Sequence, residues 1–256
     1  MELKDRVIVV TGAGSAIGEA LARRFARESP AALVLADINE ESVMSVASDL
    51  DAHGIRVDVS SPDDNQMLVA TTDERFGPVD LFCANAGIGF IGDEQTDPIE
   101  WDRMWHVNTM SHVHAAKALV PGWIARGEGY FLSTASAAGL LTNLKAAQYS
   151  VTKHAAVAFA EWLAITYGDR GIKVSCLCPM GVDTPLLDVA TEFHDLLSPH
   201  AISPGEVADA VIAGIANEEF LILPHEDVRK FFQNKANDYE RWIGGMRKLQ
   251  RSVFPE

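Results

Sequence analysis

Tyr149 and Lys153 are four residues apart in the run Tyr-Ser-Val-Thr-Lys. On a helix this spacing places both side chains on one face, one turn apart. An ammonium group beside a phenol favours the phenolate, so Lys153 is expected to lower the pKa of Tyr149 from about 10 toward neutral pH. Tyr149 is then a candidate proton donor or acceptor. The same spacing also occurs on solvated helix faces, so the other elements of the chain must decide between these two interpretations.

The composition is that of a globular α/β domain. The chain has 256 residues, of which 48% are hydrophobic and 22% are charged, which is enough for a sizeable core. The net charge of −15 argues against binding to nucleic acids or anionic membranes, although a helix N-terminus can still bind phosphate locally. No secretion signal and no apolar run of about 18 residues is evident, so we expect a cytoplasmic protein without a membrane span.

The cysteines and histidines do not follow a metal-binding pattern. The three cysteines are too few for a disulfide framework, and we expect buried free thiols at Cys83, Cys176 and Cys178. Three histidines lie close together without the spacing of metal ligands, and we expect surface or interface positions for His106, His112 and His114. The sequence therefore predicts no metal site.

A strand, a glycine-rich turn and a helix follow one another near the N-terminus. Residues 7–10 are β-branched, and a helical stretch covers 19–27; between them stands Thr11-Gly12-Ala13-Gly14-Ser15-Ala16-Ile17-Gly18. Glycines in such a turn let backbone N–H groups approach a pyrophosphate at the helix N-terminus. The run is close to T-G-x-x-x-[G/A]-x-G but is not G-x-G-x-x-G, because Ile17 occupies the last glycine's place. A plain strand-to-helix turn is the alternative.

Asp37 follows a second predicted strand, at 33–36, and lies 19 residues after Gly18. An acid at this strand tip can accept hydrogen bonds from both hydroxyls of an adenosine ribose, and it repels a 2′-phosphate. Neither Ser15 nor Ile38 offers a basic side chain, so NAD is favoured over NADP. A turn residue or helix cap before Asn39 is the alternative role.

Strands and helices alternate along the rest of the chain. Further strands are expected at 54–59, 79–83, 130–134, 173–178 and 220–223, and helices at 40–50, 63–76, 98–126, around Tyr149, and at 204–217 with Ser203 as N-cap. This predicts a single-domain Rossmann fold spanning 1–256, a doubly wound parallel sheet of about seven strands with helices on both faces. Asp58 and Asn85 follow the third and fourth strands, where ligands bind in such sheets.

Two segments stand apart from this alternation. Residues 185–203 are irregular and are expected to form a mobile substrate loop. Residues 225–256 contain apolar residues at helical spacing, which indicates a helical tail packed on the body, with a lid or a subunit contact as the alternative. The helix at 98–126 is apolar on most sides, so either the core or a partner subunit should cover it.

Together these motifs resemble the short-chain dehydrogenase/reductase family over residues 4–223. The motifs that carry the resemblance, in the family's order and spacing, are Thr11 to Gly18, Asp37, Asp58-Val59, Asn85-Ala86-Gly87, Asn108, Ser136, Tyr149-x-x-x-Lys153 and 179–184. The resemblance implies four catalytic residues. Tyr149 would be the general acid/base, and Lys153 would bind the nicotinamide ribose and keep the phenolate accessible. Ser136 would hydrogen-bond the substrate oxygen, and Asn108 would hold a water that links Lys153 to solvent.

The resemblance also implies a cofactor site. The residues expected to bind NAD are Gly12, Ser15, Ala16, Ile17, Gly18, Asp37, Ile38, Asp58, Val59, Asn85, Ala86, Gly87, Tyr149, Lys153, Pro179, Gly181, Val182 and Thr184. Of these, Asp58 and Val59 would meet the adenine, and Val182 and Thr184 would orient the carboxamide. Ala16 and Met180 depart from the family, because glycine is usual at both positions. The alanine adds a methyl group near the cofactor, and the thioether would project toward the nicotinamide or the substrate.

The substrate pocket is expected to be mostly apolar. Its predicted lining is Ile88, Phe90, Ser136, Leu140, Leu141, Tyr149, Met180, Leu186 and Leu187. This set has no arginine to clamp a carboxylate, so a lipophilic, cyclic or aromatic secondary alcohol or its ketone is favoured. The resemblance implies a homotetramer, or a homodimer, in which the Asn108 and Tyr149 helices pair between subunits.

Two alternative functions remain. One is an NADPH-dependent 3-oxoacyl or carbonyl reductase, against which Asp37 argues. The other is a dinucleotide-binding module without catalysis, which would normally have lost Ser136, Tyr149 or Lys153.

Overall fold

Seven short runs of mostly apolar residues form one parallel sheet in the computed structural model, which describes residues 1–89, 91–189 and 198–254. The strands are β1 (Val7–Thr11), β2 (Ala32–Asp37), β3 (His53–Arg56), β4 (Leu81–Ala84), β5 (Gly129–Thr134), β6 (Ile172–Leu177) and β7 (Leu221–Ile222). Their spatial order is β3-β2-β1-β4-β5-β6-β7, and every neighbouring pair is parallel. The predicted doubly wound sheet is confirmed. The strand order reverses between β1 and β4, and such a switch point opens a crevice at the carboxyl ends of the strands.

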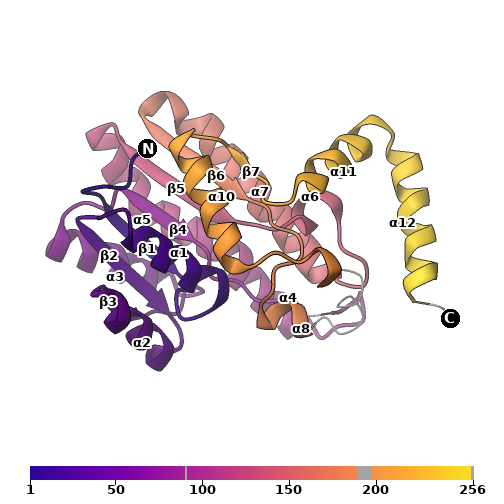
Figure 1. The fold of residues 1–256 in the computed structure, drawn as a ribbon, viewed down its shortest axis with the longest axis horizontal. Coiled ribbons are helices and arrows are strands. Elements are labelled where there is room, and N and C mark those ends of the chain that lie inside the picture. Colours follow the sequence, from indigo (N-terminus) through magenta and orange to yellow (C-terminus); the bar gives the residue numbers. More distant parts are fainter. Residues whose placement is uncertain (90, 190–197, 255–256) are drawn as a thin grey trace.

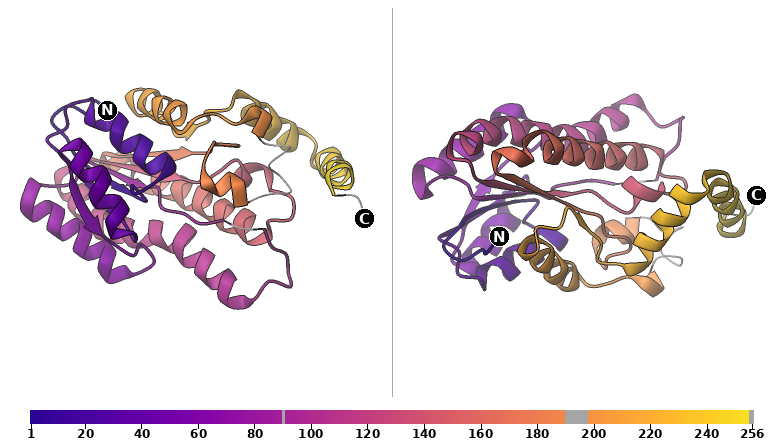
Figure 2. Two further views of the ribbon diagram at one scale, coloured as in Figure 1. Left: turned by 60° about the horizontal axis from the view of Figure 1, so that its bottom comes forward. Right: turned by 90° about the horizontal axis from the view of Figure 1, so that it is seen from above.

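Helices cover both faces of this sheet (Figures 1 and 2). They are α1 (Ala16–Ala26), α2 (Glu40–Leu50), α3 (Pro62–Phe76), α4 (Pro98–Trp105), α5 (Ser111–Arg126), α6 (Ala138–Leu141), α7 (Ala147–Tyr167), α8 (Pro185–Val189), α10 (Pro204–Ala216), α11 (Glu226–Asn237) and α12 (Tyr239–Val253). Local signals start several of them. The side chains of Asn39 and Ser61 accept hydrogen bonds from backbone N–H groups of α2 and α3, and Ser203 forms a capping box with Glu206 at α10.

Two apolar cores lie on the two faces of the sheet. Successive residues of a strand point to opposite faces, so the uninterrupted apolar runs supply both cores. Val9, for example, packs in the core formed with α3, α5 and α7, whereas Ile8 and Val10 pack in the core formed with α1, α2 and α10. The three cysteines are free and buried, as predicted. Among the described residues, no helix is long and apolar enough to cross a membrane.

The predicted helix at 98–126 is interrupted in one place. Residues His106–Met110 form a π-helical turn between α4 and α5. Such a turn holds an extra residue, and π turns are frequent at functional sites. Here the turn carries Asn108, which is fully buried.

The C-terminal tail forms two helices that differ in packing. α11 lies against α6, and its Val228 and Lys235 are buried. α12 has no buried residue and stands off from the body at the right of Figure 1. The prediction that the tail packs on the body is therefore correct for α11. In α12 the partly buried Trp242 packs against the core, and the apolar stripe of this helix also lines a cavity.

Candidate active site

A cavity of about 1410 Å³ follows the carboxyl ends of the strands and reaches α12. Pockets for one small molecule usually measure about 300–1,000 Å³, so this cavity exceeds the size that one small ligand needs. The glycine-rich turn after β1 lies in its wall, as do the tips of β2 and β4 and the first turns of α7.

Tight backbone packing shapes the glycine-rich turn. Gly12 has a φ of +65°, and a Cβ there would lie 2.8 Å from the Cα of Ala86. A Cβ on Gly18 would lie 1.9 Å from the carbonyl oxygen of Gly12, so only glycine fits where α1 begins beside the turn. Thr11 Oγ1 accepts hydrogen bonds from the N–H groups of Asn85 and Ala86. This hydroxyl joins the ends of β1 and β4, a role that the sequence motif did not reveal.

Ala16 is one of the two departures from the family, and the structure shows how the alanine is accommodated. It adopts a φ of +50°, in the left-handed region that favours glycine. The backbone conformation that glycine would adopt easily is therefore kept, and the alanine methyl group lines the cavity wall beside Ser15 and Ile17.

Asp37 lies at the far end of the cavity, at the tip of β2. Its Oδ2 accepts a hydrogen bond of 3.0 Å from Gly14 N–H, and its Oδ1 accepts one of 3.0 Å from Asn39 N–H. These two backbone donors fix the carboxylate beside the glycine-rich turn. The exposed side chain of Ile38 follows it and also lines the cavity.

The third strand is shorter than predicted. β3 ends at Arg56, and Val57 N–H donates to Asp37 O at 2.9 Å. The chain then turns, and the Asp58 carboxylate accepts hydrogen bonds from the N–H and hydroxyl of Ser60. Asp58 is thus held by its own turn, and it lines the cavity together with Val59.

Tyr149, Ser136 and Lys153 meet in the middle of the cavity wall. Tyr149 lies in the first turn of α7, and Ser136 follows β5. Lys153 is only 3% exposed, and its Nζ donates a hydrogen bond of 3.0 Å to Thr134 O. The same Nζ lies 5.7 Å from the centre of the Tyr149 ring. The helical spacing seen in the sequence therefore does bring the two side chains together.

The expected lowering of the Tyr149 pKa is wrong for this structure. Burial raises the pKa of Tyr149, and its interaction with the Ser136 hydroxyl only partly opposes that rise. Burial also lowers the pKa of Lys153 to about 8. Because the Lys153 ammonium is aimed at a backbone carbonyl, the loss of hydration outweighs its effect on the phenol.

Asn108 lies behind these groups rather than in the cavity wall. Its Nδ2 donates to Ile88 O at 2.8 Å and to Thr152 Oγ1 at 3.2 Å, while its Oδ1 accepts from Ile88 N–H at 2.9 Å. A Cβ built on Gly87 would lie 3.3 Å from both Asn108 Oδ1 and Lys153 Nζ. The amide and the ammonium thus flank the same glycine.

The cavity is lined by most of the predicted residues. Those of the predicted cofactor set in its wall are Gly12, Ser15, Ala16, Ile17, Gly18, Asp37, Ile38, Asp58, Val59, Asn85, Ala86, Gly87, Tyr149, Lys153, Pro179, Val182 and Thr184. Those of the predicted substrate set are Ile88, Ser136, Leu141, Tyr149, Met180, Leu186 and Leu187. Phe90 and positions 190–197 of the predicted loop lie outside the described residues.

Besides Asn108, two predicted residues do not line the cavity. Leu140 is buried in the core, and its carbonyl accepts a hydrogen bond from Lys235. Gly181 is held by its backbone, since its carbonyl accepts from Ile202 N–H and from the Nε2 of His225. The short helix α6 turns Leu140 and Leu141 in different directions, so apolar character alone could not separate them.

Comparison with known proteins decides the family. Residues 6–195 match the family model described as short chain dehydrogenase. The chain belongs to the short-chain dehydrogenase/reductase family. This dehydrogenase is 32% identical over 252 residues to the 1-deoxy-11-beta-hydroxypentalenate dehydrogenase of Streptomyces exfoliatus, covering 95% of the chain and 91% of the relative.

Two further likenesses agree with this assignment. The dehydrogenase is 32% identical over 190 residues to the 3beta-hydroxysteroid dehydrogenase 2 of Eggerthella lenta, covering 71% of the chain and 73% of the relative. A solved short-chain dehydrogenase/reductase from Burkholderia phymatum in complex with NAD superposes with a TM-score of 0.88 at 28% identity, covering 94% and 96% of the two chains. The protein is thus an oxidoreductase of this family.

The dehydrogenase buries a histidine that sequence analysis placed at the surface or an interface. His112 is fully buried, and its Nδ1 lies 2.9 Å from Ser133 Oγ. Burial, with a smaller contribution from the charge of Lys153, lowers the pKa of His112 to about 3. The correction follows from the position of His112 one helical turn after Asn108, on the side of α5 that faces the sheet.

Other residues of the site carry no sequence motif. His225 accepts a hydrogen bond from Met180 N–H through Nδ1 and holds Gly181 O through Nε2, so it fixes the turn after β6. Arg103 and Arg241 also line the cavity, which contradicts the expectation of a pocket without arginine. Both come from segments whose place in space the sequence did not give. Among the described residues, no group of three or more side chains could hold a metal ion.

Proposed function

We propose that this protein is an NAD-dependent dehydrogenase that interconverts a lipophilic, cyclic secondary alcohol and its ketone. The observation that carries the proposal is one continuous cavity. At one end lie the glycine-rich turn and the carboxylate of Asp37, and in the middle lie Tyr149, Ser136 and Lys153. Beyond them, toward α12, the wall is largely apolar.

The residues present fit a nicotinamide dinucleotide. The backbone around Gly12 and Gly18 has no room for side chains, which leaves N–H groups at the start of α1 free to approach a pyrophosphate. The carboxylate of Asp37, which is fixed beside the glycine-rich turn, would accept hydrogen bonds from the ribose hydroxyls and would repel a 2′-phosphate. Bound NAD would supply the hydride acceptor, and the protein would position it.

The protein's own groups would handle the proton. During reduction Tyr149 Oη gives its proton to the ketone oxygen, and in the reverse direction the Tyr149 phenolate takes the proton of the substrate hydroxyl. Ser136 Oγ donates a hydrogen bond to the same oxygen and stabilises its partial negative charge. Lys153 supplies the positive charge nearest to the phenol ring, and Asn108 lies next on the path away from the cavity.

The substrate class is supported by the cavity and by the relatives. Leu141, Leu144, Met180, Leu186 and Leu187 form an apolar wall near Tyr149. The printed names of two relatives refer to a hydroxypentalenate and a hydroxysteroid, and both are ring compounds that carry a hydroxyl group.

We further propose a homotetramer. Large apolar side chains are exposed on α4 and α7, and they include Trp105, Trp162 and Ile165. Ile165 is 84% exposed. Patches of exposed apolar side chains on packed helices are typical of protein interfaces.

Absorbance at the NADH band tests the proposed function. The protein is mixed with a panel of cyclic secondary alcohols and with equal concentrations of NAD or NADP, and initial rates are compared. We expect turnover with NAD and little with NADP. Tyr149→Phe should bind NADH normally yet lose turnover by about 10²–10⁴-fold, the usual contribution of a general acid or base. A strong NADP preference would favour the carbonyl reductase alternative, and NADH binding without any turnover would favour a binding module.

A further inference from the structure

The helices α11 and α12 close the substrate side of the cavity. Lys235 of α11 donates a hydrogen bond of 2.6 Å to Leu140 O, just after Ser136. At the other end, the ring of Phe254, directly after α12, lies 4.5 Å from Lys145 Nζ, just before Tyr149. Both anchor points belong to the segment that joins the two catalytic residues. α12 therefore contributes to the cavity wall, and it stands off from the body at the right of Figure 1.

This outer wall has an apolar part and a polar part. Trp242, Met246 and Leu249 line the cavity, and their spacing places them on one face of α12. The Trp242 ring lies 6.4 Å from the Phe231 ring of α11, which fixes its place. Arg241 also lines the cavity, at the start of α12, as do Asn234 and Asn237 from the end of α11 and Asp238 between the two helices.

The guanidinium of Arg241 is available to a ligand. No ion pair or side-chain hydrogen bond joins it to another part of the chain that the structure describes. Glu240 directly precedes Arg241 in the sequence, and no ion pair joins the two side chains in the described residues. Asp238, which also lines the cavity, accepts a hydrogen bond of 2.9 Å from the backbone N–H of Arg241 and so caps the helix. The other cavity arginine is different, because Arg103 Nη1 lies 3.6 Å from a carboxylate oxygen of Glu100.

The tail that carries Arg241 is more basic than the rest of the chain. Residues 226–254 contain seven Lys and Arg but only four Asp and Glu, although the whole chain has a net charge of −15. A planar guanidinium binds a carboxylate through two parallel hydrogen bonds, and it is less strongly hydrated than an ammonium group. Next to an apolar wall, this donor pattern matches an apolar ring system that ends in a carboxylate.

We propose that the substrate is a lipophilic ring compound with a carboxylate remote from the reacting hydroxyl, and that Arg241 binds this carboxylate. Asn234 and Asn237 supply further N–H donors beside it. The proposal rests on the proposed function, because it assigns the substrate to the same cavity. It makes Arg241 a specificity-determining residue that takes no part in the hydride or proton transfer.

Binding of an unreactive pair of probes tests the proposal. The protein with saturating NADH is titrated with decahydronaphthalene-2-carboxylic acid and with its methyl ester, which share the ring system and differ in charge. We expect the acid to bind at least about tenfold more tightly, since a hydrogen bond to a charged group contributes about 1.5–3 kcal/mol. In Arg241→Gln this preference should disappear, and in Arg241→Lys part of it should remain.

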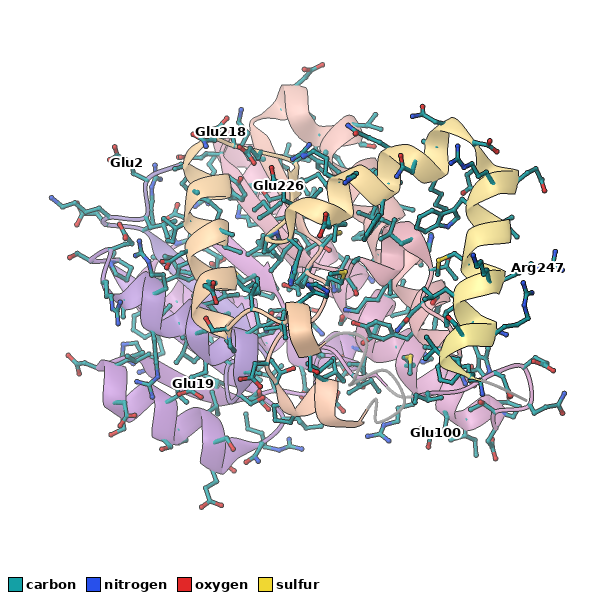
Figure 3. All side chains as sticks on the ribbon, turned by 45° about the vertical axis from the view of Figure 1, so that its right-hand side comes forward. Glu2, Glu19, Glu100, Glu218, Glu226 and Arg247 are labelled. Atoms are coloured by element: carbon teal, nitrogen blue, oxygen red, sulfur yellow. The ribbon has the colours of Figure 1, made fainter. Side chains whose placement is uncertain are left out.

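Arg247 supplies the matched control. It lies on the same helix, does not line the cavity, and points away from the body in Figure 3. Arg247→Gln removes the same charge from α12 and should keep the preference for the acid. Equal binding of acid and ester by the unmodified protein would overturn the proposal. So would a preference that survives Arg241→Gln, or one that is lost equally in Arg247→Gln. A loss in Arg103→Gln alone would overturn it too, by assigning the anion to that residue.

Turnover of neutral cyclic alcohols separates this inference from the proposed function. If these alcohols are oxidised but acid and ester bind alike, the carboxylate proposal fails and the proposed function stands. If no alcohol is oxidised but the acid preference depends on Arg241, the proposed function fails and the anion site stands. NADH binding and thermal unfolding of each variant show that it is folded, and neither should change because Arg241 is exposed.

Discussion

Lys153 is a cation in a place that disfavours positive charge, and this leads to a prediction about stability. Its side chain is almost fully buried, and its described hydrogen bond is to Thr134 O. Burial lowers the pKa of Lys153 from 10.5 to about 8. Because one pKa unit corresponds to about 1.36 kcal/mol, keeping this lysine protonated in the folded protein costs about 3 kcal/mol. We therefore expect Lys153→Met, which keeps the length and removes the charge, to stabilise the protein while abolishing turnover.

The stability gained in Lys153→Met should depend on pH. Below about pH 8 the lysine is protonated in both the folded and the unfolded chain, so the whole cost is present. Between about pH 8 and 10.5 the unfolded chain holds a proton that the folded chain has released, so the stability of the unmodified protein rises with pH. The advantage of Lys153→Met should therefore be largest near neutral pH and should shrink as the pH rises through this window.

Thermal unfolding without cofactor measures the effect. For a domain of this size 1 kcal/mol shifts the midpoint by about 2–4 °C, so Lys153→Met should raise it by about 6–12 °C at neutral pH and by less at about pH 9.5. Lys235→Met is the control, because this second buried lysine holds the tail helix α11 against the body through its hydrogen bond to Leu140 O, whereas Lys153 and Thr134 both lie within the body. That variant should be destabilised. A lower midpoint for Lys153→Met, or a gain that does not vary with pH, would refute the reasoning.

Three further predictions concern cofactor choice, the glycine-rich turn and assembly. Asp37→Asn should lower the ratio of kcat/KM with NAD to kcat/KM with NADP by about 10-fold or more, because it removes a charged hydrogen-bond acceptor; initial rates with both cofactors measure this, and an unchanged ratio would contradict the role of Asp37. Gly18→Ala should weaken NADH binding and destabilise the fold by about 1–3 kcal/mol, since its Cβ would lie 1.9 Å from Gly12 O. Gly244→Ala in α12 is the control, because a Cβ there would have no other atom within 4 Å. This variant should not be destabilised, and the thermal unfolding midpoints of the two variants are compared. Ile165→Glu should change folding stability by less than about 0.5 kcal/mol yet reduce the particle mass seen by light scattering; an unaltered mass would argue against α7 as a subunit contact.

The sheet could be predicted because most of its strands are short apolar runs between polar turns. Parallel strands buried on both faces require such runs, whereas the edge strand β3, with the sequence His-Gly-Ile-Arg, is only partly buried. The ends of the strands were harder to place. β3 stops at Arg56 rather than at Val59, because the chain turns at Asp58, whose carboxylate accepts hydrogen bonds from the N–H and hydroxyl of Ser60.

The site could be predicted only where residues are close in sequence or follow a strand. Tyr149 and Lys153 are linked by one helical turn, and Asp37 and Asn85 lie at strand ends, so their positions follow from the fold. The pKa of Tyr149 could not be predicted, because it depends on how much water the packed groups exclude. The place of α12 could not be predicted either. Its stripe shows that one face must be covered, but periodicity does not say by what.

Substitutions near the reacting groups and substitutions in the opposite wall of the cavity should have different effects. The reacting groups are fixed by the sheet and by buried helices, which tolerate few substitutions. The opposite wall includes the exposed helix α12, which is attached through Lys235 of the preceding helix α11 and through Phe254 after its last residue. Substitutions in that helix can therefore alter which molecules are accepted while the reaction chemistry stays intact. New substrate preferences in descendants of this gene would be expected to arise first near the C-terminus.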